Sequence, residues 1–417
     1  MEKELFRAII AENQEYIGRI PLVQRPLDLE EYGNYVFVGV RQAGKSYLLY
    51  QRIQQLLANG VEIENIVYIN FDDERLQGMS VTDFDLILQA YHSMYDSQPI
   101  FFFDEIQNVE GWANFARRLA NQKYRVYITG SNAKMLSRDI ETVLGGRYLD
   151  ISVFPYSFSE YLKAVGVLLS KNWQYGRKAN ELQRHFRTYF DWGGFPELVH
   201  FQEKRVWLNS LYNRIFFNDL VVRHKVKNED ALRLCVRRLA ESVKQPCSLN
   251  RLSNLIKATG TSCSPSTVME YVRYLQESCL LISIDNYVSK FVEKETIKKH
   301  YFVDNGLLHL FINNPNTSLL ENLCAITLYK KYGKGLYYYN KNIEVDFYVP
   351  DEGLAVQASY QMSDGETIER EVKALIALHG LYPLKRAMII TYEDEGEIVR
   401  DGLKIEIRPA WKWVLEG

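Results

Sequence analysis

The types and spacing of residues 39–46 point to phosphate binding. This segment reads Gly-Val-Arg-Gln-Ala-Gly-Lys-Ser, which fits the spacing Gly-x-x-x-x-Gly-Lys-Ser/Thr. Glycines let the backbone turn tightly, so that successive N–H groups point at phosphate oxygens. Lys45 is predicted to place a positive charge at the β- and γ-phosphates, and the Ser46 hydroxyl is predicted to bind Mg²⁺. The segment therefore predicts a nucleoside triphosphate site.

Two adjacent acids form a second group with the chemistry of this site. Asp104 and Glu105 follow the apolar run 100–103, so both are expected at the end of a strand beside the phosphate loop. Asp104 is predicted to hold Mg²⁺ through water, and Glu105 to polarise the attacking water as a general base. The alternative for Glu105 is an exposed acid in a turn.

The next predicted strand ends in polar residues that can contact a γ-phosphate. Ser131 and Asn132 are the candidates, because a hydroxyl or amide at this edge could hydrogen-bond the phosphate or the water. Serine and asparagine also begin turns and helices for backbone reasons, and that alternative stays open. The residues assigned to nucleotide binding are Gly39, Val40, Arg41, Gln42, Ala43, Gly44, Lys45, Ser46, Tyr47 and Ser131.

A cationic candidate follows a pair of glycines. Arg147 comes after Gly145 and Gly146, and a fixed guanidinium near the γ-phosphate would stabilise transition-state charge, in cis or from a neighbouring subunit. The alternative is a structural arginine paired with a carboxylate. Arg41 and Arg138 are weaker candidates for the same role. The predicted catalytic residues are thus Lys45, Glu105, Asn132 and Arg147.

Alternating strands and helices are expected to position these residues. Between about residues 35 and 155, short apolar runs alternate with helical patterns, which is typical of a parallel α/β sheet. Residues 156–229 read mainly as helices. Residues 230–286 read as a helix, a short helix, a turn, a longer helix and a strand, the outline of a winged helix. The runs predicted as strands of the first sheet are 35–38, 66–71, 100–103, 125–128 and 148–153.

Composition excludes several classes of protein. The 417 residues include 50 basic and 52 acidic side chains, so any contact with nucleic acid must come from a local patch. Five scattered cysteines without a Cys-x-x-Cys pair argue against a disulfide framework and a zinc site. The start of the chain lacks a signal pattern, and no apolar run approaches the roughly 18 residues that span a bilayer. We expect a cytoplasmic protein without a membrane partner.

Several motifs carry a family resemblance that spans nearly the whole chain. They include the phosphate loop, the segments 103–112 and 129–133, and further short motifs downstream. The chain resembles the prokaryotic AAA-type ATPase family with a C-terminal restriction-endonuclease-like domain of unknown function. The downstream motifs are 144–147, 155–160, 193–197, 304–307, 321–322 and 344–347.

The resemblance implies an α/β multidomain fold with ATP and Mg²⁺ as ligands. It implies an AAA-type P-loop core over 1–155, a helical segment over 156–229, a winged helix over 230–299 and a nuclease-like PD-(D/E)xK α/β domain over 300–417. ATP rather than GTP is implied by the resemblance, because the loop itself contacts only phosphates. Val40 and Ala43 depart from the residues that the family often has, but neither side chain binds phosphate.

The nuclease-like domain is expected to be inactive. Such a nuclease needs a strand acid, a second acid and a lysine on the next strand to hold Mg²⁺ and activate water. Asp346 is the strand acid, and Glu321 on a preceding helix could assist. Gln357 stands at the second acid position and Ser359 at the lysine position, and neither side chain can replace the required group.

Three functions remain open at this point. The first is an ATP hydrolase that drives movement of the appended domains, and the second is a nucleotide-gated switch with little turnover. The third, an ATP-dependent DNA nuclease, is disfavoured by Gln357 and Ser359. Partners beyond ATP are DNA, through the winged helix or a basic patch, or a protein; oligomer formation is open. The basic clusters considered for DNA are 223–227, 237–238 and 298–300.

Overall fold

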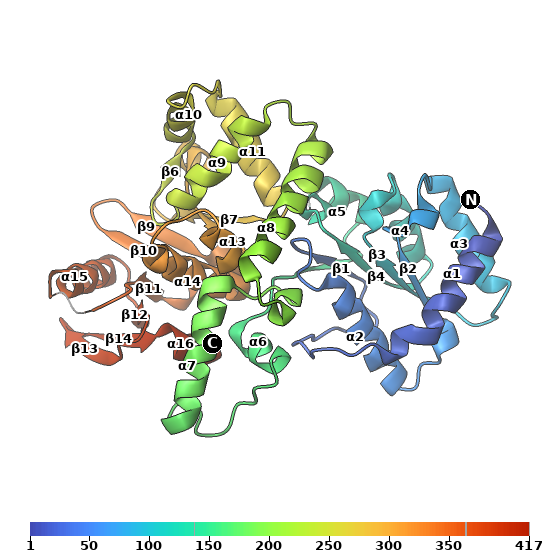
Figure 1. The fold of residues 1–417 in the computed structure, drawn as a ribbon, viewed down its shortest axis with the longest axis horizontal. Helices are drawn as coiled ribbons and strands as arrows, with labels where there is room; N and C mark the ends of the chain where they lie inside the picture. Colours follow the sequence, from blue (N-terminus) through green and yellow to red (C-terminus); the bar gives the residue numbers. More distant parts are fainter. Residues whose placement is uncertain (137, 363–364, 417) are drawn as a thin grey trace. The chain divides into compact units, whose positions relative to one another are not determined.

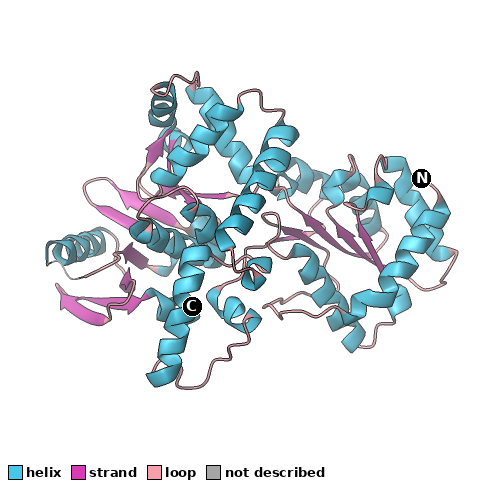
Figure 2. Cartoon of the chain, viewed as in Figure 1, coloured by secondary structure: helices cyan, strands magenta, loops and turns pink. Residues whose placement is uncertain are grey.

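The computed structural model describes residues 1–136, 138–362 and 365–416. It divides the chain into two compact units, Met1–Phe154 and Pro155–Gly417. Figure 1 follows the chain through both units, and Figure 2 separates their helices from their strands. Each unit has its own sheet and its own buried core.

The first unit is built around the predicted parallel sheet. All five expected strands are present, in the order β2-β3-β4-β1-β5, and every neighbouring pair is parallel. Because all five strands run the same way, the segments that follow them meet at one edge of the sheet. The strands are β1 (Tyr35–Val38), β2 (Ile66–Asn70), β3 (Ile100–Asp104), β4 (Arg125–Gly130) and β5 (Leu149–Ser152).

Helices connect these strands and bury their apolar faces. Phe84 and Phe115 stack with their ring centroids 4.4 Å apart, which joins the helices after β2 and β3. The central phenylalanines of β3 are fully buried. This apolar packing, rather than local helix propensity, supplies most of the stability of such a layer. The helices are α2 (Lys45–Ala58), α3 (Phe84–His92), α4 (Trp112–Asn121) and α5 (Arg138–Leu144).

A helix that the sequence pattern did not reveal covers the edge of this sheet. It is α1 (Lys3–Tyr16), and Figure 1 shows it beside β2 and α3. The Asn13 side-chain amide donates to the Tyr68 carbonyl over 3.1 Å, and the Gln14 amide donates to the Ile66 carbonyl over 3.0 Å. These bonds satisfy acceptors that an edge strand would otherwise leave open to pairing with another chain.

Helices form the first part of the second unit, as predicted. The π-helix from Ile215 to Val222 continues α8 directly. The elements expected of a winged helix then follow in the expected order, including a helix that begins at Pro265 with Ser264 as its N-cap. The helices are α6 (Phe158–Ala164), α7 (Gly176–Trp192), α8 (Lys204–Arg214), α9 (Glu229–Glu241), α10 (Leu249–Lys257) and α11 (Pro265–Glu277).

One mixed sheet of nine strands runs through the second unit. Its order is β13-β14-β12-β11-β10-β9-β7-β8-β6, and β7 pairs with β9 in parallel. The remaining helices are α12 (Phe291–Thr296), α13 (Asn305–His309), α14 (Asn316–Tyr332), α15 (Gly365–Leu381) and α16 (Ala410–Glu416). The strands are β6 (Cys247–Ser248), β7 (Leu281–Asn286), β8 (Ile297–Phe302), β9 (Tyr337–Asn340), β10 (Glu344–Val349), β11 (Leu354–Ala358), β12 (Arg386–Thr391), β13 (Gly396–Arg400) and β14 (Leu403–Pro409).

The continuous sheet changes the domain boundaries expected from the sequence. The first unit ends at Phe154, one residue before the expected boundary. The expected boundary between residues 299 and 300 falls inside β8, which pairs with β7 along four residues. Residues 155–417 therefore form one unit rather than three, because the β7–β9 pairing extends the hairpin sheet into the C-terminal sheet.

A buried aspartate explains the glycines of two downstream motifs. Asp304 accepts hydrogen bonds from the backbone N–H groups of Gly194 (2.7 Å) and Gly306 (2.8 Å). Gly193 has a φ of 79°, and a Cβ atom there would lie 1.9 Å from the Asp304 carboxylate. The hydrogen bonds of Asp304 hold the end of α7 against the start of α13, so these residues have a structural role.

Candidate functional site

The phosphate loop links β1 to α2 as the sequence predicts. Gly44 has a φ of 92° and Gln42 a φ of 63°, so the loop turns through two left-handed residues before α2 begins. Gly39 has a different constraint, because a Cβ atom on it would lie 2.0 Å from the Val153 carbonyl oxygen. The side chains of Val40 and Ala43 are buried, so these residues offer phosphate only their backbone. Backbone geometry therefore restricts both ends of the loop, through the close approach of Gly39 to Val153 and through the positive φ of Gly44.

Lys45 is buried at the start of α2 and contacts the loop that precedes it. Its Nζ donates to the carbonyl oxygens of Gly39 and Val40, both over 3.2 Å. The same ammonium lies 3.4 Å from Glu105 Oε1. The structure thus brings the predicted phosphate ligand and the predicted general base into direct contact.

Asp104 is enclosed by hydroxyl groups at the end of β3. Tyr68 donates to its Oδ2 over 2.8 Å, and Thr129 donates to its Oδ1. Burial raises the pKa of Asp104, Glu105 raises it further, and hydrogen bonds from Ser46, Thr129 and Tyr68 oppose the rise. The contact with Ser46 joins the two residues predicted to hold Mg²⁺.

Glu105 is held in an unusual conformation directly after the strand. Its φ is 52°, and its backbone N–H donates to Thr129 Oγ1 over 2.9 Å. Its side chain is only 16% exposed, so the alternative of an exposed turn acid is wrong. Burial opposes ionisation, but Lys45, a hydrogen bond from Gln107 and the charge of Arg41 outweigh it and lower the pKa of Glu105.

The two polar candidates after β4 lie in different environments. Ser131 is buried, and its Oγ lies 3.4 Å from Nε2 of Gln107. Asn132 is partly exposed, and its carbonyl accepts the Met135 N–H at the start of a 3-10 turn. Both the sensing role and the turn role of Asn132 fit this position. Tyr47 is 53% exposed on α2 and packs edge-on against another tyrosine.

Arg147 does not lie at the phosphate edge of the sheet. It precedes β5, and Asn34, which precedes β1, donates to its carbonyl oxygen. β1 and β5 are parallel, so Arg147 is at the amino edge, about 13 Å of strand away from the loop. Its guanidinium is exposed and donates to the Gly145 carbonyl over 2.9 Å. The expected role of Arg147 in cis is therefore corrected, because strand direction places it at the wrong end. The side chain of Arg138 lies outside the described residues.

Three further residues of the site, Tyr68, Gln107 and Thr129, are not among those predicted from the sequence. Thr129 bridges the two acids, since its hydroxyl contacts the Asp104 carboxylate and the Glu105 backbone. Its place at the end of a predicted strand was a usable signal, because that edge also carries Asp104. Tyr68 is inside β2, and nothing in its local sequence indicates the contact with Asp104.

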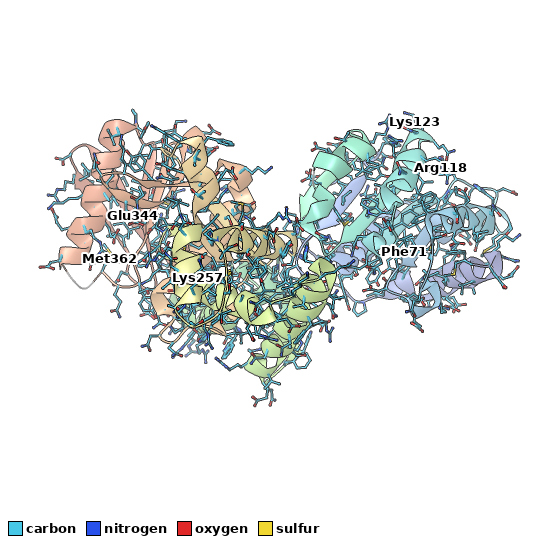
Figure 3. All side chains as sticks on the ribbon, turned by 90° about the horizontal axis from the view of Figure 1, so that it is seen from above. Phe71, Arg118, Lys123, Lys257, Glu344 and Met362 are labelled. Carbon is cyan, nitrogen blue, oxygen red and sulfur yellow. The ribbon has the colours of Figure 1, made fainter. Side chains whose placement is uncertain are left out.

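A second cluster of charged residues lies in the second unit. Glu321 of α14 and Asp346 of β10 line a pocket of about 1030 Å³ together with Gln357 of β11 and Ser359, which directly follows β11. Glu344 of the same strand also lines this pocket and is labelled in Figure 3. The four residues compared with a nuclease site are therefore gathered in one place.

The centre of this cluster is Lys299, which belongs to the basic cluster 298–300 of the sequence. Lys299 of β8 is fully buried, and its Nζ lies 3.0 Å from Asp346 and 3.2 Å from both Glu321 and Glu344. Burial disfavours its charge, but these three carboxylates raise the pKa of Lys299. Two of the three residues in the basic cluster 298–300, which was considered for DNA contact, are therefore buried. His300 is buried as well, and Lys298 pairs with Asp285 over 3.0 Å.

The sheet order, the phosphate loop and the acids after β3 define a P-loop protein of the AAA class. Residues 32–162 match the family described as AAA domain, in agreement with that class. Residues 183–318 match a domain of unknown function, DUF8612. Neither description speaks of a nuclease or of DNA, so those parts of the resemblance stay predictions.

Over nearly its whole length the chain is similar to two uncharacterized proteins. It is 31% identical over 434 residues to one from Methanocaldococcus jannaschii, covering 99% of this chain and 96% of that protein. It is 30% identical over 394 residues to one from Haemophilus influenzae, covering 91% of this chain and 94% of that protein. The chain belongs to the protein family of these relatives.

Similar solved structures add little to this assignment. A Walker-type ATPase of Pyrococcus abyssi has a TM-score of 0.41 at 11% identity, covering 74% of this chain and 95% of that chain. AMPPCP-bound DnaA from Aquifex aeolicus has a TM-score of 0.27 at 16% identity, covering 66% and 87%. These scores are too low to carry an argument about function.

Proposed function

We propose that this protein is a Mg²⁺-dependent ATP hydrolase. The observation that carries the proposal is the convergence of Lys45, Ser46, Asp104 and Glu105 at one edge of the first sheet, with Lys45 Nζ 3.4 Å from Glu105 Oε1. A protein that only binds nucleotide has no need of a buried, ionised acid beside its phosphate ligand.

The residues at this edge divide the chemistry between them. The loop backbone and Lys45 bind the phosphates, and Glu105 accepts a proton from the attacking water. Mg²⁺ prefers oxygen ligands, and the Ser46 hydroxyl and Asp104 carboxylate, which contact one another, fit that preference. When bound, Mg²⁺ would neutralise charge that develops on the phosphates.

Steady-state ATP hydrolysis by two variants tests the proposal. Lys45→Ala should lose nucleotide binding and turnover together, because it removes the buried cation. Glu105→Gln should bind a fluorescent ATP analogue like the wild type but lose roughly 10²- to 10⁴-fold in kcat, as expected for loss of a general base. The same assays with GTP test the preference for ATP, which rests on the family resemblance.

The nucleotide-gated switch is the other outcome of this experiment. Wild-type turnover at background, with and without added DNA, would overturn the hydrolase proposal and leave a nucleotide-binding switch. Loss of analogue binding in Glu105→Gln would remove Glu105 from its assigned role. A matched control is Glu110→Gln, an exposed acid in the turn before α4.

For the second unit we propose a winged-helix segment and a nuclease-like C-terminal part without nuclease activity. The carboxylates of its pocket are already engaged. Asp346 contacts Lys299 with one oxygen and accepts the Ala358 N–H with the other over 3.1 Å. The side-chain amide oxygen of Gln357 accepts a hydrogen bond from the Asp346 N–H, and its nitrogen donates to the Glu344 carbonyl. Within the described residues no three His, Cys, Asp or Glu side chains are grouped to hold a metal ion.

Plasmid cleavage tests this part of the proposal. We expect no nicking with Mg²⁺ or Mn²⁺, with or without ATP. Nicking that disappears in Asp346→Asn but persists in Asp351→Asn, a variant of an exposed acid after β10, would overturn it. The proposed role of the second unit is then to bind DNA or a protein as nucleotide state changes.

The proposed partner of the winged-helix segment is DNA or a protein. On α11, Ser266, Met269 and Arg273 are exposed, and Arg273 pairs with Glu277 over 3.7 Å. This face is mixed in charge, so it fits a protein at least as well as DNA. Within the described residues, no helix has both the length and the apolar character to cross a membrane. We keep a cytoplasmic location and oligomer formation, with Arg147 acting in trans, as predictions.

A further inference from the structure

Gln107 lies between the proposed general base and the turn after β4. It belongs to the 3-10 turn Ile106–Asn108, directly after Glu105. Its Nε2 donates to Glu105 Oε2 over 2.5 Å and lies 3.4 Å from Ser131 Oγ. Because an ionised carboxylate only accepts hydrogen bonds, the amide nitrogen must face Glu105.

The other side of the Gln107 amide is held by packing. Gly130, the last residue of β4, has no side chain, and a Cβ atom there would lie 2.6 Å from Gln107 Oε1. That oxygen is buried. The same Cβ atom would lie 1.8 Å from the Met135 sulfur, so the side chains of Gln107 and Met135 both pack closely against Gly130.

Three side chains hold Glu105: Lys45, Gln107 and Ser131, whose hydroxyl also hydrogen-bonds the carboxylate. Lys45 Nζ lies 3.4 Å from Oε1, and Gln107 Nε2 lies 2.5 Å from Oε2. Lys45 is also the residue predicted to contact the β- and γ-phosphates, so bound nucleotide competes with Glu105 for its ammonium. The Gln107 contact does not depend on a group that binds phosphate. It is the contact that can keep the carboxylate in place during turnover.

We propose that Gln107 is a positioning residue that holds the Glu105 carboxylate and ties it to Ser131 in the turn after β4. The proposal rests on the hydrolase function proposed above. Ser131 contacts Glu105 directly as well as through the Gln107 amide, so a change at Ser131 on nucleotide binding would reach the base by both contacts. Gln107 contacts Ser131, a predicted γ-phosphate contact, over 3.4 Å, but its shorter contact is with Glu105, so we assign its effect to Glu105.

Two substitutions of Gln107 separate positioning from folding. Gln107→Ala removes the donor, and Gln107→Glu keeps the size of the side chain but replaces the donor with a second acceptor. Both should lower kcat roughly 10- to 100-fold, the range expected when a catalytic group is displaced by about 1 Å. The KM for ATP and the affinity for a fluorescent ATP analogue should stay within about twofold of the wild type, because the phosphate loop is untouched.

A double variant shows whether Gln107 acts through Glu105. In a Glu105→Gln background, adding Gln107→Ala should cause no further loss in single-turnover hydrolysis, because the group that Gln107 positions is already gone. Gln122→Ala is the matched control, since Gln122 is exposed at the end of α4, before β4 and thus at the opposite edge of the sheet.

The outcomes distinguish this inference from the proposed function. Wild-type kcat in Gln107→Ala or Gln107→Glu would overturn the positioning role, and so would an equal further loss in the double variant. A fall in kcat that Gln122→Ala reproduces would also overturn it. Wild-type turnover in Glu105→Gln alone would instead overturn the proposed base, and the inference with it.

Discussion

At the scale of single residues, Gly39 is under a severe steric constraint in the phosphate loop. An added Cβ atom would lie 2.0 Å from the Val153 carbonyl oxygen, which belongs to backbone rather than to a movable side chain. Gly39→Ala must therefore shift the loop or the end of β5. We expect loss of ATP-analogue binding by at least about tenfold and a lower melting temperature, measured by fluorescence titration and calorimetry.

Gly60→Ala is the control for this prediction. Unlike Gly39, Gly60 has a positive φ, of 88°, and a Cβ atom there would meet nothing within 4 Å. Its replacement should cost about 1 kcal/mol from backbone strain alone and leave ATP binding unchanged. Equal binding losses in the two variants would show that the close approach at Gly39 is not what shapes the site.

At the scale of elements, the β7–β8 hairpin contains a buried histidine that makes the second unit sensitive to acid. His300 contacts the Ser283 hydroxyl across the hairpin, with 2.8 Å between Nδ1 and Oγ. Burial lowers the pKa of His300 to about 4, and Lys298 adds to the effect. The folded hairpin therefore holds His300 neutral, whereas the unfolded chain takes up a proton near pH 6.5.

The sign of the pH dependence follows from this difference. The unfolded state binds more protons between about pH 6.5 and 4, so the contribution of His300 is present above pH 6.5 and is lost as the pH falls through that window. The difference between the folded and unfolded pKa values of His300 corresponds to roughly 3 kcal/mol in the free energy of unfolding. We expect the free energy of unfolding, measured by urea denaturation, to fall accordingly, and His300→Gln to remove that part of the slope.

A second buried group, Asp304, gives the stability a pH dependence of the opposite sign, so its effect must be separated from that of His300. Burial raises the pKa of Asp304 to about 6, against the hydrogen bonds from Gly194 and Gly306. Its contribution to stability is present at low pH and is lost as the pH rises through about 6. The difference between wild type and His300→Gln isolates the histidine. An unchanged slope in the variant would contradict the prediction.

At the scale of the whole molecule, two units with separate cores predict two responses to nucleotide. The proposed site lies entirely within Met1–Phe154. Mg²⁺-ATP at 100 times its dissociation constant should stabilise that unit by about 2.7 kcal/mol. We expect its calorimetric transition to rise by about 5–10 °C, and limited proteolysis with mass spectrometry to show protection of residues 1–154. Lys45→Ala should show neither effect, and a shift of the same size in that variant would contradict the site.

The spacing of residues along the sequence was sufficient to predict much of the first unit. The phosphate loop, the five strands and the acids of β3 were predicted, because each is a short segment whose chemistry or periodicity is complete within a few residues. The contact between Lys45 and Glu105 also followed in outline, since parallel strands bring the segments after them to one edge. For these parts the sequence by itself determined the strands, the loop and which of the predicted site residues lie together.

The tertiary structure decided what depends on residues far apart in the chain. Strand direction places Arg147 at the amino edge of the sheet. Strand pairing places Lys299 among three carboxylates rather than in an exposed basic cluster. The contacts of Gln107 with Glu105 and Ser131 are visible only in the folded sheet, where the segments after β3 and β4 lie next to each other. Hydrophobic periodicity tells which face of a segment is buried but not which other segment covers it, so these contacts could not be read from the sequence.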